Sequence, residues 1–224
     1  MTNDLTPKDR MAIDRQKMPE QDAGARQRTF TEVNLGFTEQ LALLEARRCL
    51  LCKSPKCISG CPVLVDIPRF INFLAEGNLQ AAAESLLSDN ALPAITGRVC
   101  PQETQCEEVC VRGVKGAPVA VGYLERYVAD WARTHGVSTG KPNVEPSGKR
   151  VAVIGSGPAG LTAAGELVTF GHDVTIYEAF HTPGGVLVYG IPEFRLPKQI
   201  VEDEVERLKA QGVKIECNVI IGKT

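Results

Sequence analysis

The sequence lacks the marks of several protein classes. No apolar run approaches the roughly eighteen residues of a membrane-spanning helix, and no apolar stretch follows the charged start MTNDLTPKDR, as a signal peptide requires. The formal net charge is only −2 and the basic residues are dispersed, so no basic stripe is available for nucleic acid. We therefore expect a cytoplasmic protein with no membrane span and no nucleic-acid partner.

Histidine is also scarce, with three residues, whereas cysteine is abundant, with eight. Thiols stay reduced in the cytoplasm, and an odd-numbered cluster of cysteines cannot close completely as disulfides. Seven cysteines lie between positions 49 and 110, while Cys217 stands alone and is expected to be a small buried side chain on a strand. The pattern indicates metal binding, with free thiols as the weaker alternative.

The first four cysteines have the spacing C-x2-C-x4-C-x3-C-P, which differs from the run of bacterial ferredoxins only in its middle gap. In those proteins the fourth cysteine ligates the other cluster. We therefore predict one [4Fe-4S] cluster on Cys49, Cys52 and Cys57. The second cluster takes the remaining four thiols: Cys61, Cys100, Cys106 and Cys110.

The first cluster lacks a fourth thiolate, and Glu125, which borders an apolar helical stripe, is the nearest non-thiol candidate. Its helical position alone favours an ordinary half-exposed glutamate over a ligand. Zinc also binds C-x2-C knuckles, but such sites usually pair two separated knuckles and often include histidine. We interpret Arg47, Arg48 and Lys53 as a solvated helix face, with contact to an acidic partner as the alternative.

The periodicity divides the chain into three parts. Residues 1–36 read as an N-terminal arm, 37–140 as a helical domain and 148–224 as the first part of a Rossmann-like domain, joined by a Gly-, Pro- and Ser-rich linker. In the middle part we expect helices at 38–52, 66–74, 78 to about 92, 103–112 and 118–134. The last part alternates strand and helix, as in a parallel sheet.

The stretch VAVIGSGPAGL places a glycine fingerprint between a strand and a helix. Glu178 ends the next strand, where a carboxylate accepts hydrogen bonds from a ribose and repels a 2′-phosphate. This context predicts a site for FAD or NAD. The residues expected to line it are Gly155, Ser156, Gly157, Pro158, Ala159, Gly160, Glu178, Gly184 and Gly185.

Six stretches in this order resemble the flavin and iron–sulfur family that includes the small (beta) subunit of NADPH-dependent glutamate synthase. Relatives are the large subunit of NADH-dependent ferredoxin:NADP oxidoreductase and the N-terminal part of dihydropyrimidine dehydrogenase. The stretches are MPEQDAGAR, EARRCLLCKSPKCISGCPVLVDIPRFI, GRVCPQETQCEEVC, VGYLERYVADW, VAVIGSGPAGL and PGGVLVYGIPEFRLPK.

The resemblance implies an α-helical ferredoxin-like domain with two [4Fe-4S] clusters, followed by an α/β Rossmann-like FAD domain. It implies that Glu125 is a cluster ligand, that Glu178 holds the FAD ribose, and that Gly185 and Arg195 lie on the flavin side. NADPH binds in a domain that relatives carry and this chain lacks, so we expect a truncated chain. The catalytic residues are unknown.

The function expected from this resemblance is electron transfer between FAD and a partner subunit, most simply the large subunit of glutamate synthase. Another electron-accepting subunit, and the missing C-terminal half as a separate chain, are further candidate partners. The alternatives are a ferredoxin:NADP oxidoreductase subunit and a non-catalytic iron–sulfur module for electron transfer or assembly.

Overall fold

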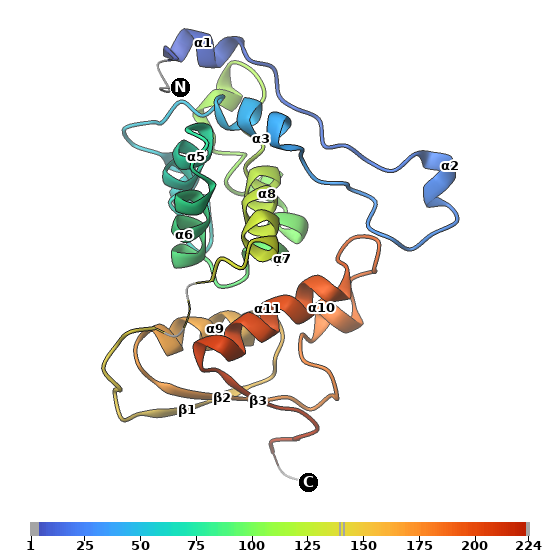
Figure 1. Ribbon diagram of the computed structural model, residues 1–224, viewed down its shortest axis with the longest axis vertical. Coiled ribbons are helices and arrows are strands. Elements are labelled where there is room, and N and C mark those ends of the chain that lie inside the picture. The colour runs from blue at the N-terminus through green and yellow to red at the C-terminus, as the bar shows by residue number, and fades with distance from the viewer. Residues whose placement is uncertain (1–4, 139, 141, 223–224) are drawn as a thin grey trace. The chain divides into compact units, whose positions relative to one another are not determined.

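The computed structural model describes residues 5–138, 140 and 142–222, which form two compact units. The first comprises the described residues up to 29 together with Val33–Val137, and the second comprises Phe30–Glu32 and the residues from Ser138 onward. Figure 1 shows helices in the first unit and a sheet covered by helices in the second.

The first unit is built from short helices and has no strand longer than a single bridge among its described residues. Helix α6 packs on both α5 and α8, α7 packs on α8, and α3 packs on α5 (Figure 1). The elements are α1 (Pro7–Ala12), α2 (Ala23–Arg26), α3 (Glu39–Ala46), α4 (Lys56–Ser59), α5 (Ile67–Ala75), α6 (Leu79–Asp89), α7 (Pro93–Val99), η1 (Gln102–Thr104), η2 (Val111–Val114) and α8 (Val121–Thr134).

Helix α5 shows how the sequence specifies these elements. The Asp66 side chain caps its first turn by accepting from the Arg69 N–H, and Pro68 fits a position where no backbone N–H is needed. Phe70, Ile71 and Leu74 then recur at helical spacing and are fully buried. Burial of this stripe stabilises the helix far more than its propensity does.

Gly97 allows α7 and α8 to approach closely. A Cβ on residue 97 would lie 2.6 Å from the backbone nitrogen of Arg126, closer than real Cβ contacts come. The Gly97→Ala variant is therefore expected to lower the free energy of unfolding by about 1–3 kcal/mol, because the helices must separate. Urea unfolding followed by the fluorescence of Trp131, the single tryptophan of the chain, measures the change in α8.

Gly116 supplies the matched control for this substitution. Its nearest neighbour beyond the adjacent residues, the carbonyl oxygen of Arg112, would lie 3.9 Å from an added Cβ, which is ordinary contact. The Gly116→Ala variant should keep the wild-type urea midpoint. Equal midpoints for both variants would contradict the close approach of α7 and α8.

Two expectations about helices are wrong, and one helix was not foreseen. Residues 103–112 do not form an α-helix: η1 ends at Thr104, turns follow, and Cys110 precedes η2. Helix α3 ends at Ala46, so Cys49 and Cys52 lie in the loop beyond it rather than at its C-terminus. The helix that follows Asn78 ends at Asp89, before Pro93 as expected, but α7 was not foreseen: it begins at Pro93, because proline fits the first turn of a helix.

The second unit contains a parallel sheet of three strands in the order β1-β2-β3, among the residues that the structure describes. Residues Val151 and Val174 are in register between β1 and β2, and Ile176 and Ile215 between β2 and β3. The elements are β1 (Arg150–Ile154), α9 (Pro158–Thr169), β2 (Asp173–Tyr177), α10 (Val186–Tyr189), α11 (Lys198–Gln211) and β3 (Lys214–Glu216).

The alternation of strand and helix agrees with the expected parallel sheet, but the last strand is shorter than expected. Strand β3 ends at Glu216, so Cys217 lies beyond it and is half-buried rather than buried. Asn218 follows with a positive φ of 60°, a conformation that asparagine tolerates and that interrupts a strand.

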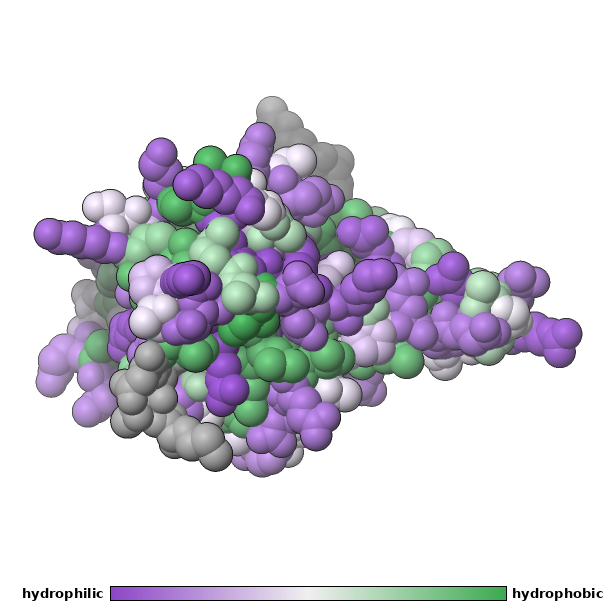
Figure 2. Space-filling view, turned by 90° about the horizontal axis from the view of Figure 1, so that it is seen from above, coloured by the Kyte–Doolittle hydropathy of each residue, from purple (hydrophilic) through white to green (hydrophobic). Residues whose placement is uncertain are grey.

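None of the helices in the described ranges has the length and apolar character needed to cross a bilayer. On the face of the molecule shown in Figure 2, hydrophobic residues are interspersed among hydrophilic ones. Isolated exposed apolar side chains of this kind are normal for globular proteins.

Candidate iron–sulfur and nucleotide sites

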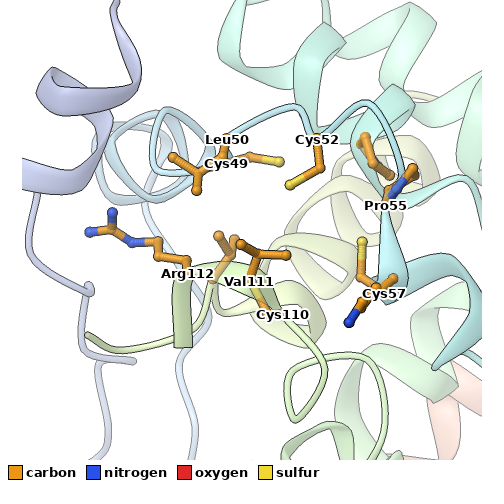
Figure 3. A pocket seen from close by; sticks show the side chains of 11 residues that line it. Cys49, Leu50, Cys52, Pro55, Cys57, Cys110, Val111 and Arg112 are labelled. Atoms are coloured by element: carbon orange, nitrogen blue, oxygen red, sulfur yellow. The ribbon is translucent and has the colours of Figure 1, made fainter. Parts of the chain in front are cut away.

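Four thiols line one small cavity in the first unit. They belong to Cys49, Cys52, Cys57 and Cys110, and the wall between them is formed by Leu50, Pro55, Val111 and neighbouring residues. Figure 3 shows the sulfur atoms of Cys49, Cys52 and Cys57 turned toward the same space, which Cys110 approaches from the opposite side. None of the eight cysteines of the chain forms a disulfide.

The loop after α3 and helix α4 place the first three of these thiols. The backbone N–H of Leu51 donates a hydrogen bond to the Cys49 thiol, and Leu51 adopts a φ of 48°, which is rare for a bulky residue. Burial raises the pKa of Cys49 to about 11 and that of Cys57 to about 12. Because metal ligands are thiolates, binding of a cationic cluster here would release protons.

A second group of donors lies around Cys106. Burial raises the pKa of this thiol to about 12, and the charges of Glu107, Glu125 and Cys61 raise it further. Burial also raises the pKa of Cys100 to about 11, with smaller contributions from the same Glu125 and Cys61. Three thiols and one carboxylate therefore interact in this region: Cys61, Cys100, Cys106 and Glu125.

The structure corrects the expected division of ligands. Cys110 lies with Cys49 and its neighbours, not with Cys61, and Glu125 lies with Cys100 and Cys106, not with Cys49. The cause is the missing helix at 103–112. In a helix Cys106 and Cys110 would share one face, whereas the turns between them send the two side chains to different sites.

Glu125 lies on the buried side of α8. Its side chain accepts hydrogen bonds from the Asn90 amide and the Thr96 hydroxyl. Burial raises the pKa of Glu125 to about 7, although these two hydrogen bonds oppose the rise. The expected alternative, an ordinary half-exposed glutamate, is therefore wrong, since 9% of the residue is exposed.

Within the described residues, no group of three or more Cys, His, Asp or Glu side chains is close enough to hold a single metal ion. A single zinc ion requires thiolates at about 2.3 Å, so its ligands crowd together. A four-iron cluster accepts its ligands at separate corners and needs them further apart.

A buried ion pair near the first group of thiols holds the N-terminal segment, at Ile13 and Gln16, through hydrogen bonds. Arg48 and Glu45 are 1% and 0% exposed and pair with one another. The Arg48 guanidinium also donates to the carbonyl oxygens of Ile13 at 3.1 Å and Ala117 at 2.8 Å, and Glu45 accepts from the Gln16 N–H at 2.7 Å. Interpretation of Arg48 as part of a solvated helix face is therefore wrong.

Two further arginines tie the same segment to the cavity. Arg112, which lines the cavity, donates to the carbonyl oxygens of Arg10 at 2.8 Å and of Ile13. In turn, Arg10 donates to the carbonyl oxygen of Cys49 at 2.8 Å. Sequence reasoning missed these contacts because residues 1–36 have too little periodicity to indicate that they pack on the thiol-bearing loops.

The glycine fingerprint of the second unit forms the turn between β1 and α9. Gly155 has a φ of 91°, and a Cβ on Gly160 would lie 2.0 Å from the Gly155 carbonyl oxygen. Both positions therefore require glycine. At Gly157, by contrast, an added Cβ would meet no described atom within 4 Å, so this backbone faces open space that a phosphate can approach.

Glu178 is held against this turn. Its carboxylate accepts from the N–H groups of Ser156 and Phe180, at 2.8 and 2.9 Å, and from the Ser156 hydroxyl. Although burial acts in the opposite direction, these hydrogen bonds hold the pKa of Glu178 below its ordinary value. The N–H of Gly184 donates to the Ser156 hydroxyl at 2.9 Å. The loop that contains Gly184 and Gly185 therefore belongs to the same hydrogen-bond network as Glu178.

The other predicted nucleotide-site residues lie in different surroundings. Pro158 and Ala159 are exposed in the first turn of α9, and Gly185 packs so closely on Gly157 that a Cβ would come within 2.9 Å of it. Arg195 is exposed in the turn before α11, where its N–H donates to the Pro192 carbonyl. The structure thus brings Gly185, but not the Arg195 side chain, into contact with the fingerprint.

The Gly157→Ala variant is expected to lose flavin binding and keep its fold. An added methyl group would occupy the space that a pyrophosphate needs, and it would touch no described protein atom. Quenching of FAD fluorescence on titration with protein measures binding, and the thermal melting curve checks the fold. FAD binding equal to that of the wild type would show that residue 157 does not face the phosphates.

Comparisons with known proteins agree with this two-part organisation. Residues 26–137 match the family described as dihydropyrimidine dehydrogenase domain II, 4Fe-4S cluster. Residues 149–221 match the family described as pyridine nucleotide-disulphide oxidoreductase. Among solved structures, 6-hydroxypseudooxynicotine amine oxidase (HisD) of Pseudomonas geniculata N1 aligns over 75% of this chain and 22% of that chain, with 20% identity and a TM-score of 0.33, which is too low to support an argument.

Three curated relatives carry more specific names. The chain is 43% identical over 198 residues to the NAD-dependent dihydropyrimidine dehydrogenase subunit PreT of Escherichia coli O157:H7, which covers 88% of the chain and 48% of that protein. It is 39% identical to the glutamate synthase small chain (NADPH) of Azospirillum brasilense, over 93% of the chain and 44% of the relative. The glutamate synthase small chain (NADPH) of Bacillus subtilis (strain 168) is 35% identical, over 95% of this chain and 44% of the relative. The chain thus spans about half the length of these relatives.

Proposed function

Because the chain belongs to the family described as dihydropyrimidine dehydrogenase domain II, 4Fe-4S cluster, we propose that it is the electron-transferring part of a flavin and iron–sulfur oxidoreductase. In this proposal electrons pass between FAD and a partner subunit of the glutamate synthase type. The observation that carries the proposal is the presence of two separate groups of four buried or half-buried donors in one helical unit.

The donor chemistry fits two [4Fe-4S] clusters. The first would be held by Cys49, Cys52, Cys57 and Cys110, and the second by Cys61, Cys100, Cys106 and Glu125. Thiolates are the usual ligands of such clusters, which, when bound, supply one-electron redox chemistry. The protein contributes rigid loops, exclusion of water by apolar walls, and the buried arginines beside the first group.

The second unit is proposed to bind FAD at the carboxyl ends of its strands. Gly157 offers bare backbone to the pyrophosphate, and α9 begins at the next residue, so its N-terminal N–H groups face the same space. The Glu178 carboxylate lies at the end of β2, where a ribose would compete with Ser156 for its oxygens. NADPH would bind outside these 224 residues, on the part of the enzyme that relatives carry.

The test of this function is electron delivery to a partner. Anaerobic protein reduced with dithionite should lose visible absorbance and regain it when the large subunit of glutamate synthase is added together with glutamine and 2-oxoglutarate. Addition of NADPH to the chain alone separates two further hypotheses. Bleaching of bound flavin indicates a catalytic unit, whereas no bleaching indicates an electron-transfer or assembly module without chemistry of its own.

A second candidate partner is a subunit that acts on pyrimidines. The 43% identity to a subunit of NAD-dependent dihydropyrimidine dehydrogenase exceeds the 39% identity to a glutamate synthase small chain. In this case the reduced protein should be reoxidised by the partner dehydrogenase subunit with uracil, and not by the glutamate synthase subunit. We further propose that the chain acts in the cytoplasm, where thiolate ligands escape oxidation.

A further inference from the structure

A small polar network buried beneath α8 ends on one oxygen of Glu125. The Asn90 amide nitrogen lies 2.8 Å from Glu125 Oε1 and 2.8 Å from the Thr96 hydroxyl. The Thr96 hydroxyl lies 2.6 Å from the same Oε1. Asn90 is 5% exposed and its bond to Glu125 is buried, whereas Thr96 is half-buried. Within the described residues, no other hydrogen bond reaches the carboxylate, and Oε2 receives none.

The orientation of the Asn90 side chain is fixed by a backbone group. The Asn90 side-chain oxygen accepts from the Leu92 N–H at 2.9 Å, and a backbone N–H can only donate. The amide nitrogen of Asn90 must therefore face Thr96 and Glu125. The Thr96 hydroxyl accepts from Asn90, and the nearest acceptors for its own proton are Glu125 Oε1 at 2.6 Å and the Leu92 carbonyl oxygen at 3.0 Å. The carboxylate oxygen is the nearer and carries the charge, so both donors act on Oε1.

The helices hold these three side chains at fixed positions. Asn90 follows directly after α6, Thr96 lies in α7, and Glu125 lies in α8, which packs closely on both. Gly97 permits the approach of α7 to α8. The same helix α7 leads into Cys100, so the residue that orients Glu125 and a candidate thiolate ligand share one rigid element.

We propose that Asn90 and Thr96 are positioning residues that fix Glu125 as a one-oxygen ligand and raise the reduction potential of its cluster. The inference rests on the proposed function, since it assigns Oε2 to the cluster of Cys61, Cys100 and Cys106. Donors outside the ligand shell orient ligands and tune the metal. A hydrogen bond donated to a ligand withdraws negative charge from it, which favours the reduced cluster.

The experiment compares variants of Thr96 in anaerobically prepared full-length chain. Thr96→Val removes the hydroxyl at nearly constant shape, and Thr96→Ser restores it. The matched control is Thr104→Val, since the Thr104 hydroxyl donates only to the Pro101 carbonyl on an exposed turn. Iron and acid-labile sulfide are measured for each protein, and the potentials of both clusters are obtained by redox titration with electron paramagnetic resonance.

The expected result is a shift of one potential. The cluster concerned is identified as the one that is lost in a Cys61→Ser variant. In Thr96→Val this cluster should have a more negative reduction potential at unchanged iron content, while the other cluster keeps its potential. Thr96→Ser and Thr104→Val should match the wild type. Asn90→Asp keeps the acceptor for the Leu92 N–H but cannot donate to Glu125, so it should shift the same cluster in the same direction, or prevent its assembly.

Two results would overturn the inference alone. One is that both clusters keep their wild-type reduction potentials in Thr96→Val and in Asn90→Asp. The other is that Thr104→Val shifts the reduction potential by as much as Thr96→Val does. Wild-type protein that binds no iron or sulfide would instead overturn the proposed function, and the inference with it. The wild-type measurement thus separates the two failures.

Discussion

Replacement of Cys110 by serine is expected to remove the same cluster as replacement of Cys52 and to spare the cluster that depends on Cys61. Cys110 and Cys52 line one cavity, whereas Cys61 interacts with Cys100 and Cys106. Loss of one thiolate from a buried site leaves an open corner on the cluster. Each of the two variants should therefore retain about half of the wild-type iron and acid-labile sulfide, roughly four atoms of each per chain.

Electron paramagnetic resonance of the dithionite-reduced variants identifies the cluster that remains. Cys110→Ser and Cys52→Ser should give the same residual spectrum, and Cys61→Ser the complementary one. Cys217→Ser is the control, because this half-buried thiol lies in the second unit, beyond β3. The opposite pairing, in which Cys110→Ser and Cys61→Ser share a spectrum, would restore the division that spacing alone suggests and contradict the structure.

The second large effect is expected at the buried ion pair of Arg48 and Glu45. Arg48→Met removes the cation and leaves the Glu45 carboxylate, which is 0% exposed, without its partner. Stranding a buried charge in this way costs about 3–5 kcal/mol of the free energy of unfolding. The variant also loses the hydrogen bonds that join Ile13 and Ala117 to the loop after α3. Urea unfolding followed by Trp131 fluorescence reports the loss within the first unit.

An exposed ion pair provides the contrast. Lys209 and Glu206 lie 2.7 Å apart on α11, with side chains 41% and 61% exposed. Lys209→Met should change stability by about 0–1 kcal/mol, because water already solvates both charges. A double variant of Glu45→Leu with Arg48→Met should recover part of the loss, since it leaves no unpaired charge. An Arg48→Met protein with the wild-type urea midpoint would contradict the burial of the pair.

Local signals in the sequence predicted much of the fold. Thr38, Asp66 and Asn78 each cap the helix that follows by accepting a backbone N–H, as their side chains and positions indicate. The change from helical to alternating periodicity after the linker predicted the parallel sheet. These features depend on neighbours within a few residues, which the sequence displays directly.

The grouping of ligands could not be predicted in the same way. Cys106 and Cys110 have the spacing of one helical face, yet the chain turns between them, and nothing within this stretch reveals the turn. Proline at 93 was interpreted only as a stop, although it also begins α7. The position of Cys110 opposite Cys49 depends on contacts between segments about 60 residues apart, which periodicity does not encode.

The same limit applies to Asn90, Thr96 and Arg48. Each is a polar residue near a helix end, where exposure is the usual outcome. Asn90 and Arg48 are buried and Thr96 is half-buried, as a result of the packing of α6, α7 and α8 and of the N-terminal segment that covers Arg48. Glu125 bordered an apolar stripe in the sequence, but only the approach of α7 through Gly97 makes it a buried carboxylate.

The most direct test of this account is chemical analysis of protein purified under strict exclusion of oxygen. Two four-iron clusters predict about eight iron atoms and about eight acid-labile sulfides per chain, together with brown colour that dithionite bleaches. A colourless protein that contains zinc, or one with neither iron nor sulfide under conditions that preserve such clusters, would contradict it.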